Sequence, residues 1–150
     1  MRSHFGIIIY VNNAPIIWYS KRQNTFEASS FGSYFVALKI ATEMIEDLRY
    51  KSRYFGIPVA GPVEVFCDNM SVVKNSSIPT SVLKNMYNDI CYHRVRKAQA
   101  AGIIQVGWIP RDLDLSDLFT KTIMPGNTRH NLVDSIFSNT ASPIGDIKKA

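Results

Sequence analysis

The sequence predicts an α/β domain with a mixed sheet. The first reason is the order of its elements, which runs hairpin, helix, strand, helix, strand, helix along the chain. The second is the composition of the 150 residues, 46% hydrophobic and 19% charged, which is typical of a folded core rather than a disordered chain. We expect one domain over residues 1–138 and a short tail over 139–150.

The predicted strands are apolar and rich in β-branched side chains. Asn12-Asn13 is a turn signal that joins the first two strands into a hairpin. Gly61-Pro62 ends an irregular segment immediately before the third strand. The predicted strands cover residues 5–11, 15–20, 63–68 and 103–109.

The first long helix is predicted from apolar residues spaced three and four positions apart. Ser29 or Ser30 provides an N-cap for it. Gly102 ends the second long helix. The apolar stripe of the first helix consists of Tyr34, Leu38, Ala41, Ile45 and Leu48. The first predicted helix begins at residue 29 or 30 and ends near 54. The other predicted helices cover 70–74, 81–101, 115–121 and 132–137.

Charge and cysteine usage limit the possible classes of protein. The net charge of +5 and the pI of about 9.3 permit a phosphate-rich partner without requiring one. Cys67 and Cys91 have no metal-binding spacing, and we interpret them as reduced core residues of an intracellular protein, cytoplasmic or nuclear. The apolar stretch from Ile7 to Tyr19 is too short to span a bilayer, so no membrane partner is expected.

Two acidic residues follow apolar strands and are the main catalytic candidates. Asp68 closes the 63–68 strand, and Asp117 follows the 103–109 strand. Carboxylates at the ends of two core strands can hold a divalent cation at the edge of a sheet. For Asp68 the alternative is a helix N-cap, and the spacing leaves these two roles evenly open.

The acidic cluster around Asp117 has a second interpretation. Asp114 is a candidate N-cap for the 115–121 helix, which would place Asp117 at the third helical position. Composition alone favours this capping role over metal binding, because Mg²⁺ usually needs two or more carboxylates from distant chain segments. Two of the three clustered residues Asp112, Asp114 and Asp117 are expected to face water.

The second long helix is basic and carries interleaved tyrosines, Tyr87 and Tyr92. Its cations could bind phosphates and its tyrosines could stack on bases. Without other information, a solvated helix face is the favoured interpretation. Trp18 and Trp108 lie on predicted strands, where we expect core positions. The candidate nucleic-acid-binding residues of this helix are Lys84, His93, Arg94, Arg96 and Lys97.

Six short motifs occur in an order that resembles a known family. Together they look like the ribonuclease H domain of a copia-type (LTR) retrotransposon Pol polyprotein, over residues 2–137. Each motif alone is weak, and the ordered set is specific. The motifs are Trp18-Tyr19-Ser20-Lys21-Arg22-Gln23, Ala28-Ser29-Ser30 leading into Phe35-Val36-Ala37-Leu38, Phe66-Cys67-Asp68-Asn69, Cys91-Tyr92-His93-Arg94-Val95-Arg96, Val106-Gly107-Trp108 and Asp117-Leu118-Phe119-Thr120-Lys121.

The resemblance implies a ribonuclease H-like mixed sheet of five strands flanked by helices. It also implies cleavage of the RNA strand of an RNA/DNA hybrid with two Mg²⁺ ions, within a polyprotein that contains a reverse transcriptase. Four acidic residues form the family site. Asp68 matches the third and Asp117 the fourth, both as catalytic residues and as metal ligands, and the basic helix would face the hybrid.

The other two acids of the family site have no match in this sequence. Tyr34 occupies the position where the family carries Glu, and a phenol is neutral near pH 7 and a poor Mg²⁺ ligand. The first acid belongs to a strand expected before Arg2. We therefore expect a sheet without the family's first, central strand, and an activity impaired or lost. The alternatives are a non-catalytic nucleic-acid-binding remnant and a non-functional transposon-derived fragment.

Overall fold

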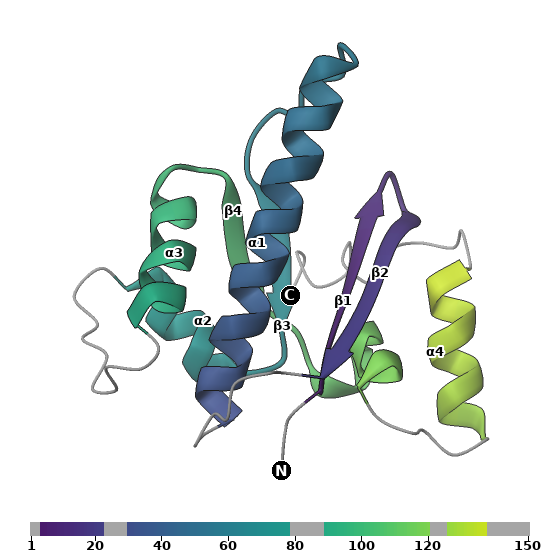
Figure 1. Cartoon of the computed structure of the whole chain (residues 1–150). Coiled ribbons are helices and arrows are strands. Elements are labelled where there is room, and N and C mark those ends of the chain that lie inside the picture. The colour runs from purple at the N-terminus through teal and green to yellow at the C-terminus, as the bar shows by residue number, and fades with distance from the viewer. Residues whose placement is uncertain (1–3, 23–29, 79–88, 121–125, 138–150) are drawn as a thin grey trace. The chain divides into compact units, whose positions relative to one another are not determined.

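The computed structural model describes residues 4–22, 30–78, 89–120 and 126–137, which belong to two compact units (Figure 1). One unit contains residues 4–22, 109–120 and 126–137, and the other contains 30–78 and 89–108. Strands and helices occur in both units, so the predicted α/β class is confirmed and is consistent with a ribonuclease H-like fold. The tail at 139–150 lies outside the described residues, and the boundary at 138 stays a prediction.

The first unit begins with the predicted hairpin. Strand β1 (His4–Val11) pairs antiparallel with β2 (Ala14–Arg22), which runs two residues past the predicted end. Asn12 and Asn13 have φ values of 49° and 66°. A two-residue hairpin turn with positive φ at both positions matches the twist of its strands, and asparagine tolerates this conformation.

A short 3₁₀ helix, η3 (Leu115–Phe119), packs against this hairpin. A Cβ atom at Gly6 would lie 2.6 Å from the carbonyl oxygen of Ser116, so only glycine permits this approach. The hydroxyl of Ser20 donates to the carbonyl of Phe119 at 2.6 Å. The predicted 115–121 helix is therefore a shorter 3₁₀ helix, preceded by η2 (Arg111–Leu113).

Helix α4 (Asn127–Phe137) completes the first unit and begins five residues before its predicted start. It buries Leu132 and Ile136, four positions apart and hence on one helix face.

Strand β1 has one packed face. Its buried residues Phe5, Ile7 and Ile9 alternate with less buried ones, as expected for a strand that packs on one side.

The second unit is organised around α1 (Ser30–Tyr54). Its buried side chains, Phe35, Leu38, Ala41, Thr42 and Ile45, lie along one face at helical spacing. The central part of the predicted apolar stripe is therefore confirmed, whereas Tyr34 and Leu48 at its two ends are only half-buried.

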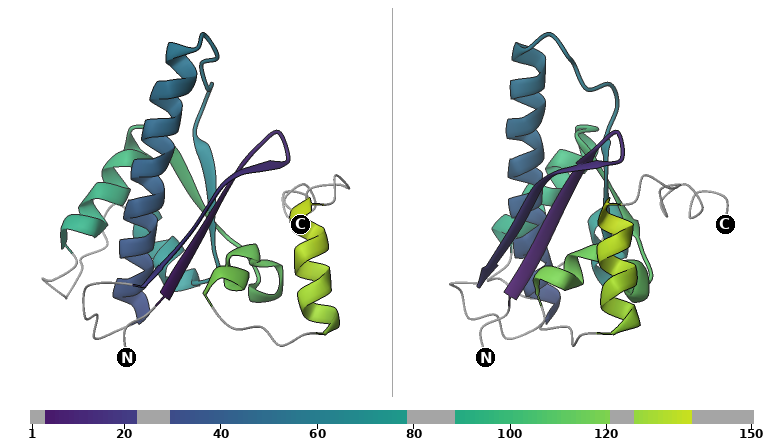
Figure 2. Two further views of the ribbon diagram at one scale, coloured as in Figure 1. Left: turned by 45° about the vertical axis from the view of Figure 1, so that its right-hand side comes forward. Right: turned by 90° about the vertical axis from the view of Figure 1, so that its right-hand side faces the viewer.

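Strand β3 (Val63–Cys67) pairs in parallel with β4 (Ile104–Trp108). Helix α2 (Met70–Ser77) follows β3 and is three residues longer than predicted, and α3 (Asp89–Ala100) precedes β4. Both helices pack against α1, as Figure 2 shows from two further sides. Residues 79–88, which include the predicted start of the second long helix, lie outside the described part.

Each strand pair is a two-stranded sheet of its own. Among the described residues, no further strand pairs with β1 or β3. Trp18 and Trp108 are exposed, so their predicted core positions are wrong. Alternate side chains of a strand point to opposite faces, and Trp18 lies on the exposed face of β2 with Ile16. Trp108 shares a face with the buried Ile104 and Val106, but it is the last residue of β4 and is exposed there.

Cys67 is buried, Cys91 is half-buried, and neither forms a disulfide. In the parts of the chain that the structure describes, no helix combines the length and apolar character needed to cross a membrane.

Candidate active site

Asp68 directly follows the carboxyl end of β3 rather than closing the strand, which ends at Cys67. Cys67 lies opposite Trp108 in the parallel pair, so both strands end at the same edge of the sheet. The indole N–H of Trp108 donates to the backbone carbonyl of Asp68 at 3.3 Å. This edge is where ligands collect in parallel sheets, and Trp108 helps to hold the backbone of Asp68 there.

Asn69, and not Asp68, caps the next helix. The Oδ1 atom of Asn69 accepts hydrogen bonds from the backbone N–H groups of Ser71 at 3.1 Å and Val72 at 3.3 Å. These are two of the donors that the first turn of a helix leaves unsatisfied. The N-cap alternative therefore does not account for Asp68, whose side chain is half-buried with one carboxylate oxygen inaccessible to solvent.

Asp117 lies in the first turn of η3, in the other unit. Asp114 accepts hydrogen bonds from the backbone N–H of Ser116 at 2.9 Å and from its hydroxyl at 2.7 Å, so the predicted N-cap is confirmed. Asp117 occupies the third helical position, and the Thr120 hydroxyl lies 3.4 Å from its Oδ1 atom. Asp112 is exposed, whereas Asp114 and Asp117 are half-buried, so the prediction that two of the three face water is wrong.

Tyr34 lies near the start of α1 and is half-buried. Figure 1 shows the N-terminal end of α1 at the same end of its unit as the carboxyl end of β3, which Asp68 follows. The position where the family carries Glu and the position of Asp68 therefore belong to one end of this unit. Asp117 belongs to the other unit and is described only within it.

The carboxylates do not form a metal site within the described residues. No group of three or more His, Cys, Asp or Glu side chains there could hold a metal ion. Each unit contributes one of the two predicted acids, and Tyr34 adds a neutral phenol. Since hard divalent cations bind several oxygen ligands and usually more than one carboxylate, this donor set does not fit a pair of Mg²⁺ ions.

One titratable group of the first unit is clearly perturbed. Burial raises the pKa of the Tyr10 phenol on β1 above its usual value of 10.0. Its hydroxyl oxygen is inaccessible to solvent and has no hydrogen-bond partner among the described residues. The residue as a whole is half-buried, on the face of β1 opposite to Phe5, Ile7 and Ile9.

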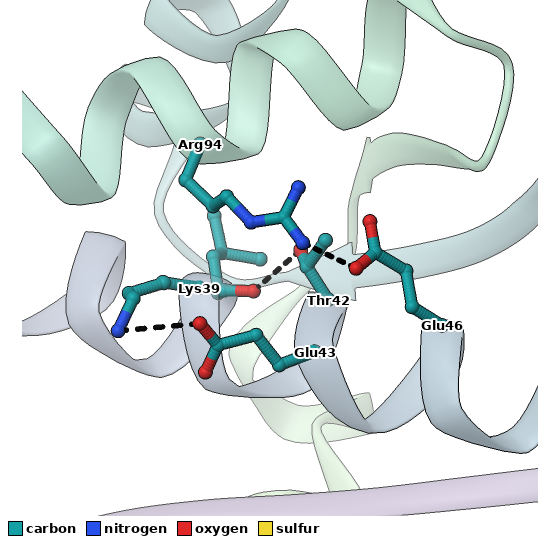
Figure 3. Close-up of polar contacts among 6 residues, drawn as sticks. Lys39, Thr42, Glu43, Glu46 and Arg94 are labelled. Carbon is teal, nitrogen blue, oxygen red and sulfur yellow. Dashed lines mark hydrogen bonds and ion pairs between the residues drawn. The ribbon is translucent and has the colours of Figure 1, made fainter.

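The basic residues predicted on the second long helix divide into two groups. His93 and Lys97 are exposed on α3. Arg94 instead pairs with Glu46 of α1, as Figure 3 shows, and Arg96 donates to the Tyr92 hydroxyl at 2.8 Å. Lys84 lies outside the described residues, and whether any of these side chains binds nucleic acid stays a prediction.

Tyr92 does not have the role in base stacking that its place in a basic helix suggested. It is buried, and its ring meets that of Phe35 edge to face at a centroid distance of 5.4 Å. The guanidinium of Arg96 lies over the Tyr92 ring, 5.0 Å from the ring centroid. The stacking prediction was therefore wrong for Tyr92, and Tyr87 lies outside the described residues.

Sequence reasoning missed a different surface, at the C-terminal end of α1. Exposed aromatic side chains gather there next to cations. The signal that could have found it is the run Arg49-Tyr50-Lys51-Ser52-Arg53-Tyr54-Phe55, which alternates cations and aromatics after the last residue of the apolar stripe.

Comparison with known proteins identifies relatives among transposon polyproteins. The chain is 25% identical over 140 residues to the Retrovirus-related Pol polyprotein from transposon RE1 of Arabidopsis thaliana, covering 93% of the chain and 9% of that protein. It is 23% identical over 118 residues to the corresponding polyprotein from transposon RE2 of the same plant, covering 79% of the chain and 8% of that protein. No family model and no solved structure matches the chain. The chain thus spans less than a tenth of these relatives, and the similarity supports an origin in a retrotransposon Pol polyprotein.

Proposed function

We propose that the chain is a ribonuclease H-like domain of a copia-type retrotransposon polyprotein whose cleavage of RNA/DNA hybrids is impaired or lost. One observation carries the proposal: Asp68 follows the carboxyl end of β3 while its neighbour Asn69 caps α2. A cation site at this edge of the sheet would use an acid that follows the strand and is not needed to cap the helix. The ordered motifs and the two Pol relatives support the same family.

The loss of activity is proposed from the donor set. Asp68 and Asp117 supply two carboxylates, whereas Tyr34 supplies a group that is uncharged near neutral pH. Two Mg²⁺ ions, when bound in such a site, would activate a water and stabilise the leaving oxygen. With Tyr34 in place of Glu, the negative charge available to attract these ions is lower.

The context of the domain is proposed from its relatives. Since they are Pol polyproteins, the domain would belong to a longer chain with other Pol segments. The resemblance to a ribonuclease H domain implies a reverse transcriptase segment and an RNA/DNA hybrid as partners. Cys67 and Cys91 form no disulfide, which fits a reducing compartment, cytoplasmic or nuclear.

The test is Mg²⁺-dependent cleavage of a labelled hybrid by the chain and by a repaired variant. The repaired variant combines Y34E with an added upstream strand that carries an aspartate. We expect the unmodified chain to cleave no faster than D68N, and the repaired variant to cleave in a way that D68N and D117N abolish. D112N, which removes an exposed carboxylate near Asp117, is the matched control and should leave the repaired activity unchanged.

Two outcomes would contradict the proposal in different ways. Cleavage by the unmodified chain that D68N abolishes would show that activity is retained. A repaired variant that folds and leaves the hybrid intact would remove the catalytic assignment of Asp68 and Asp117. The Mg²⁺ dependence of the melting temperature measures ion binding separately from cleavage, because an ion that binds only the native state stabilises it.

A non-catalytic nucleic-acid-binding remnant is the second candidate, favoured by the exposed His93 and Lys97 on α3. It predicts affinity for a hybrid that falls as salt rises, because bound cations release counterions from the phosphates. K97Q should reduce the slope of this salt dependence. Binding that does not respond to salt would count against this candidate.

A further inference from the structure

We propose that the C-terminal end of α1, with the turn after it, is a binding site for single-stranded nucleic acid. We call this surface the aromatic end and define it by Tyr50, Arg53, Tyr54, Phe55 and Ile57. It is distinct from the residues assigned above to catalysis and from the basic face of α3. The proposal does not depend on whether Asp68 and Asp117 are catalytic.

The aromatic end brings several exposed apolar side chains together in one segment. Tyr50, Tyr54 and Phe55 are 73%, 81% and 74% exposed. In Figures 1 and 2, this end of α1 extends beyond α2, α3, β3 and β4, and the connection to β3 runs beside it. Exposed apolar surface concentrated in one segment usually marks a binding site, whereas scattered exposed side chains do not.

The side chains of the aromatic end share one stripe of the helix. Tyr50, Arg53 and Tyr54 are separated by three and four positions, so they are neighbours on the helix surface. Phe55 meets Tyr54 edge to face, with ring centroids 5.8 Å apart and an interplanar angle of 82°. Because both rings remain highly exposed, part of their surface stays available for stacking with a base.

The backbone that carries these rings is fixed by hydrogen bonds. Gly56 has a φ of 76° and donates to the carbonyl of Arg53 at 3.0 Å, and Ile57 donates to that of Ser52 at 2.9 Å. This pattern is a Schellman motif, which closes a helix in one defined conformation. Side chains held on such a backbone lose less conformational entropy when they bind a ligand.

Arg49 holds the segment between α1 and β3 against the helix. Its guanidinium donates to the carbonyl of Gly61 at 2.6 Å and to that of Val59 at 3.3 Å. The segment that follows Ile57 is thus held beside α1, and it does not cover the three rings, given their exposure. Arg49 therefore has a structural role and is not available as a main contact to phosphate.

The charge of this region is complementary to a polyanion. No Asp or Glu occurs from residue 48 to residue 63, whereas three cations do, Arg49, Lys51 and Arg53. Lys51 pairs with Asp47 at 2.7 Å, and the guanidinium of Arg53 has no partner among the described residues. A cation between exposed aromatic rings is the arrangement with which proteins bind a phosphate and its neighbouring bases.

A single strand fits this surface better than a duplex. The faces of the bases are accessible in a single strand but stacked on one another in a duplex, and every base has a face that can stack on an aromatic ring. A protein partner would use the same apolar area, yet the excess of cations and the lack of acids favour phosphate.

The test measures binding of a fluorescein-labelled oligodeoxythymidylate of about 12 nucleotides, within the range of known single-strand sites. The full chain should bind at low salt, and an unlabelled duplex should compete less well than the unlabelled single strand. Y54S and F55S should each weaken binding about tenfold, the effect of losing one stacked base. R53Q should reduce the slope of log affinity against log salt by about 0.7, the contribution of one phosphate contact to a single strand.

Two matched controls separate this site from other surfaces. F137S removes an aromatic ring of α4 that is as exposed as Phe55, and it should leave affinity unchanged. K74Q removes an exposed cation from α2, to which no binding role is assigned, and should leave affinity unchanged. Circular dichroism and the melting temperature show whether each variant folds, and the exposure of these side chains predicts that it does.

Three results would overturn the proposal. The first is no binding by the folded chain at low salt, and the second is equal binding by Y54S, F55S and the unmodified chain. The third is a duplex that competes as well as the single strand, which would indicate phosphate contacts without stacking. If F55S instead abolishes self-association in analytical ultracentrifugation while oligonucleotide binding is absent, the surface is a contact between copies of the chain. A failure of hybrid cleavage would not bear on any of these results.

Discussion

The two ends of α1 contrast two uses of the same residue types. Toward the N-terminal end, Phe35 is fully buried and packs against Phe31 and Tyr92. Twenty positions further along the chain, in the turn directly after the helix, Phe55 is exposed and contacts only the ring of Tyr54 among the described aromatic residues. The difference lies in the surroundings, because α3 covers the first part of α1 and no described element of the unit covers the last turn.

This contrast shows where the hydrophobic core ends along α1. The apolar spacing of α1 predicts a helix over its whole length, but spacing alone does not indicate how far the covering elements reach. An apolar side chain on a helix lowers the free energy of folding only where another surface removes it from water. Beyond that point the same residue types are available for binding.

The largest expected effect tests the contrast directly. F35A should lower the free energy of unfolding by about 3–5 kcal/mol, the cost of a cavity left by a buried phenylalanine. F55A, at the exposed end, should change it by less than about 0.5 kcal/mol. Urea unfolding of the two variants provides the measurement. Equal losses would mean that the C-terminal end of α1 is packed in the folded protein.

The next effect concerns the backbone that shapes the aromatic end. G56A should lower the free energy of unfolding by about 1 kcal/mol, because alanine at positive φ is strained. A Cβ there would meet no atom within 4 Å, so the cost comes from the backbone alone. G126A is the matched control, since Gly126 has equally open surroundings and no positive φ. A G56A variant as stable as G126A would show that the Schellman motif is not needed.

Local sequence patterns predict much of this fold. Asn12-Asn13 predicts the hairpin because few residue pairs accept positive φ at two successive positions. Asp114 is predicted as an N-cap because its carboxylate reaches N–H groups only two positions away. In each case the partner atoms are close in sequence, so the pattern contains the whole interaction.

Contacts between distant segments are not predictable in this way. Arg94 is a candidate for phosphate binding by sequence, and the structure pairs it with Glu46, 48 positions away. Tyr92 could stack on bases by its place in a basic helix, but packing against Phe35 buries it. For the candidate site, sequence identifies Asp68 and Asp117 as acids, and the choice of Asn69 as helix cap requires the coordinates.

A smaller effect is expected for the ion pair at the packed part of α1. Arg94 and Glu46 are both half-buried, and the pair joins α3 to α1 (Figure 3). A double-mutant cycle with R94M and E46Q should give a coupling energy of about 0.5–1 kcal/mol, the upper part of the range for pairs with some exposure. The coupling should persist in salt, because partly buried charges are screened less than exposed ones. A coupling of zero would mean that the two helices pack without help from this pair.

The smallest effect concerns the ion pair next to the aromatic end. Lys51 and Asp47 lie four positions apart on α1, both exposed, with 2.7 Å between Nζ and Oδ2. A cycle with K51Q and D47N should give about 0.3–0.5 kcal/mol, the value for such pairs on a helix surface, and should approach zero near 1 M salt. The acid precedes the base, which is the favourable direction for the helix dipole. If this coupling persisted in high salt as strongly as that of Arg94 with Glu46, the pair would be shielded from solvent. The last turns of α1 would then be covered in solution, and the contrast between the two ends of the helix would fail.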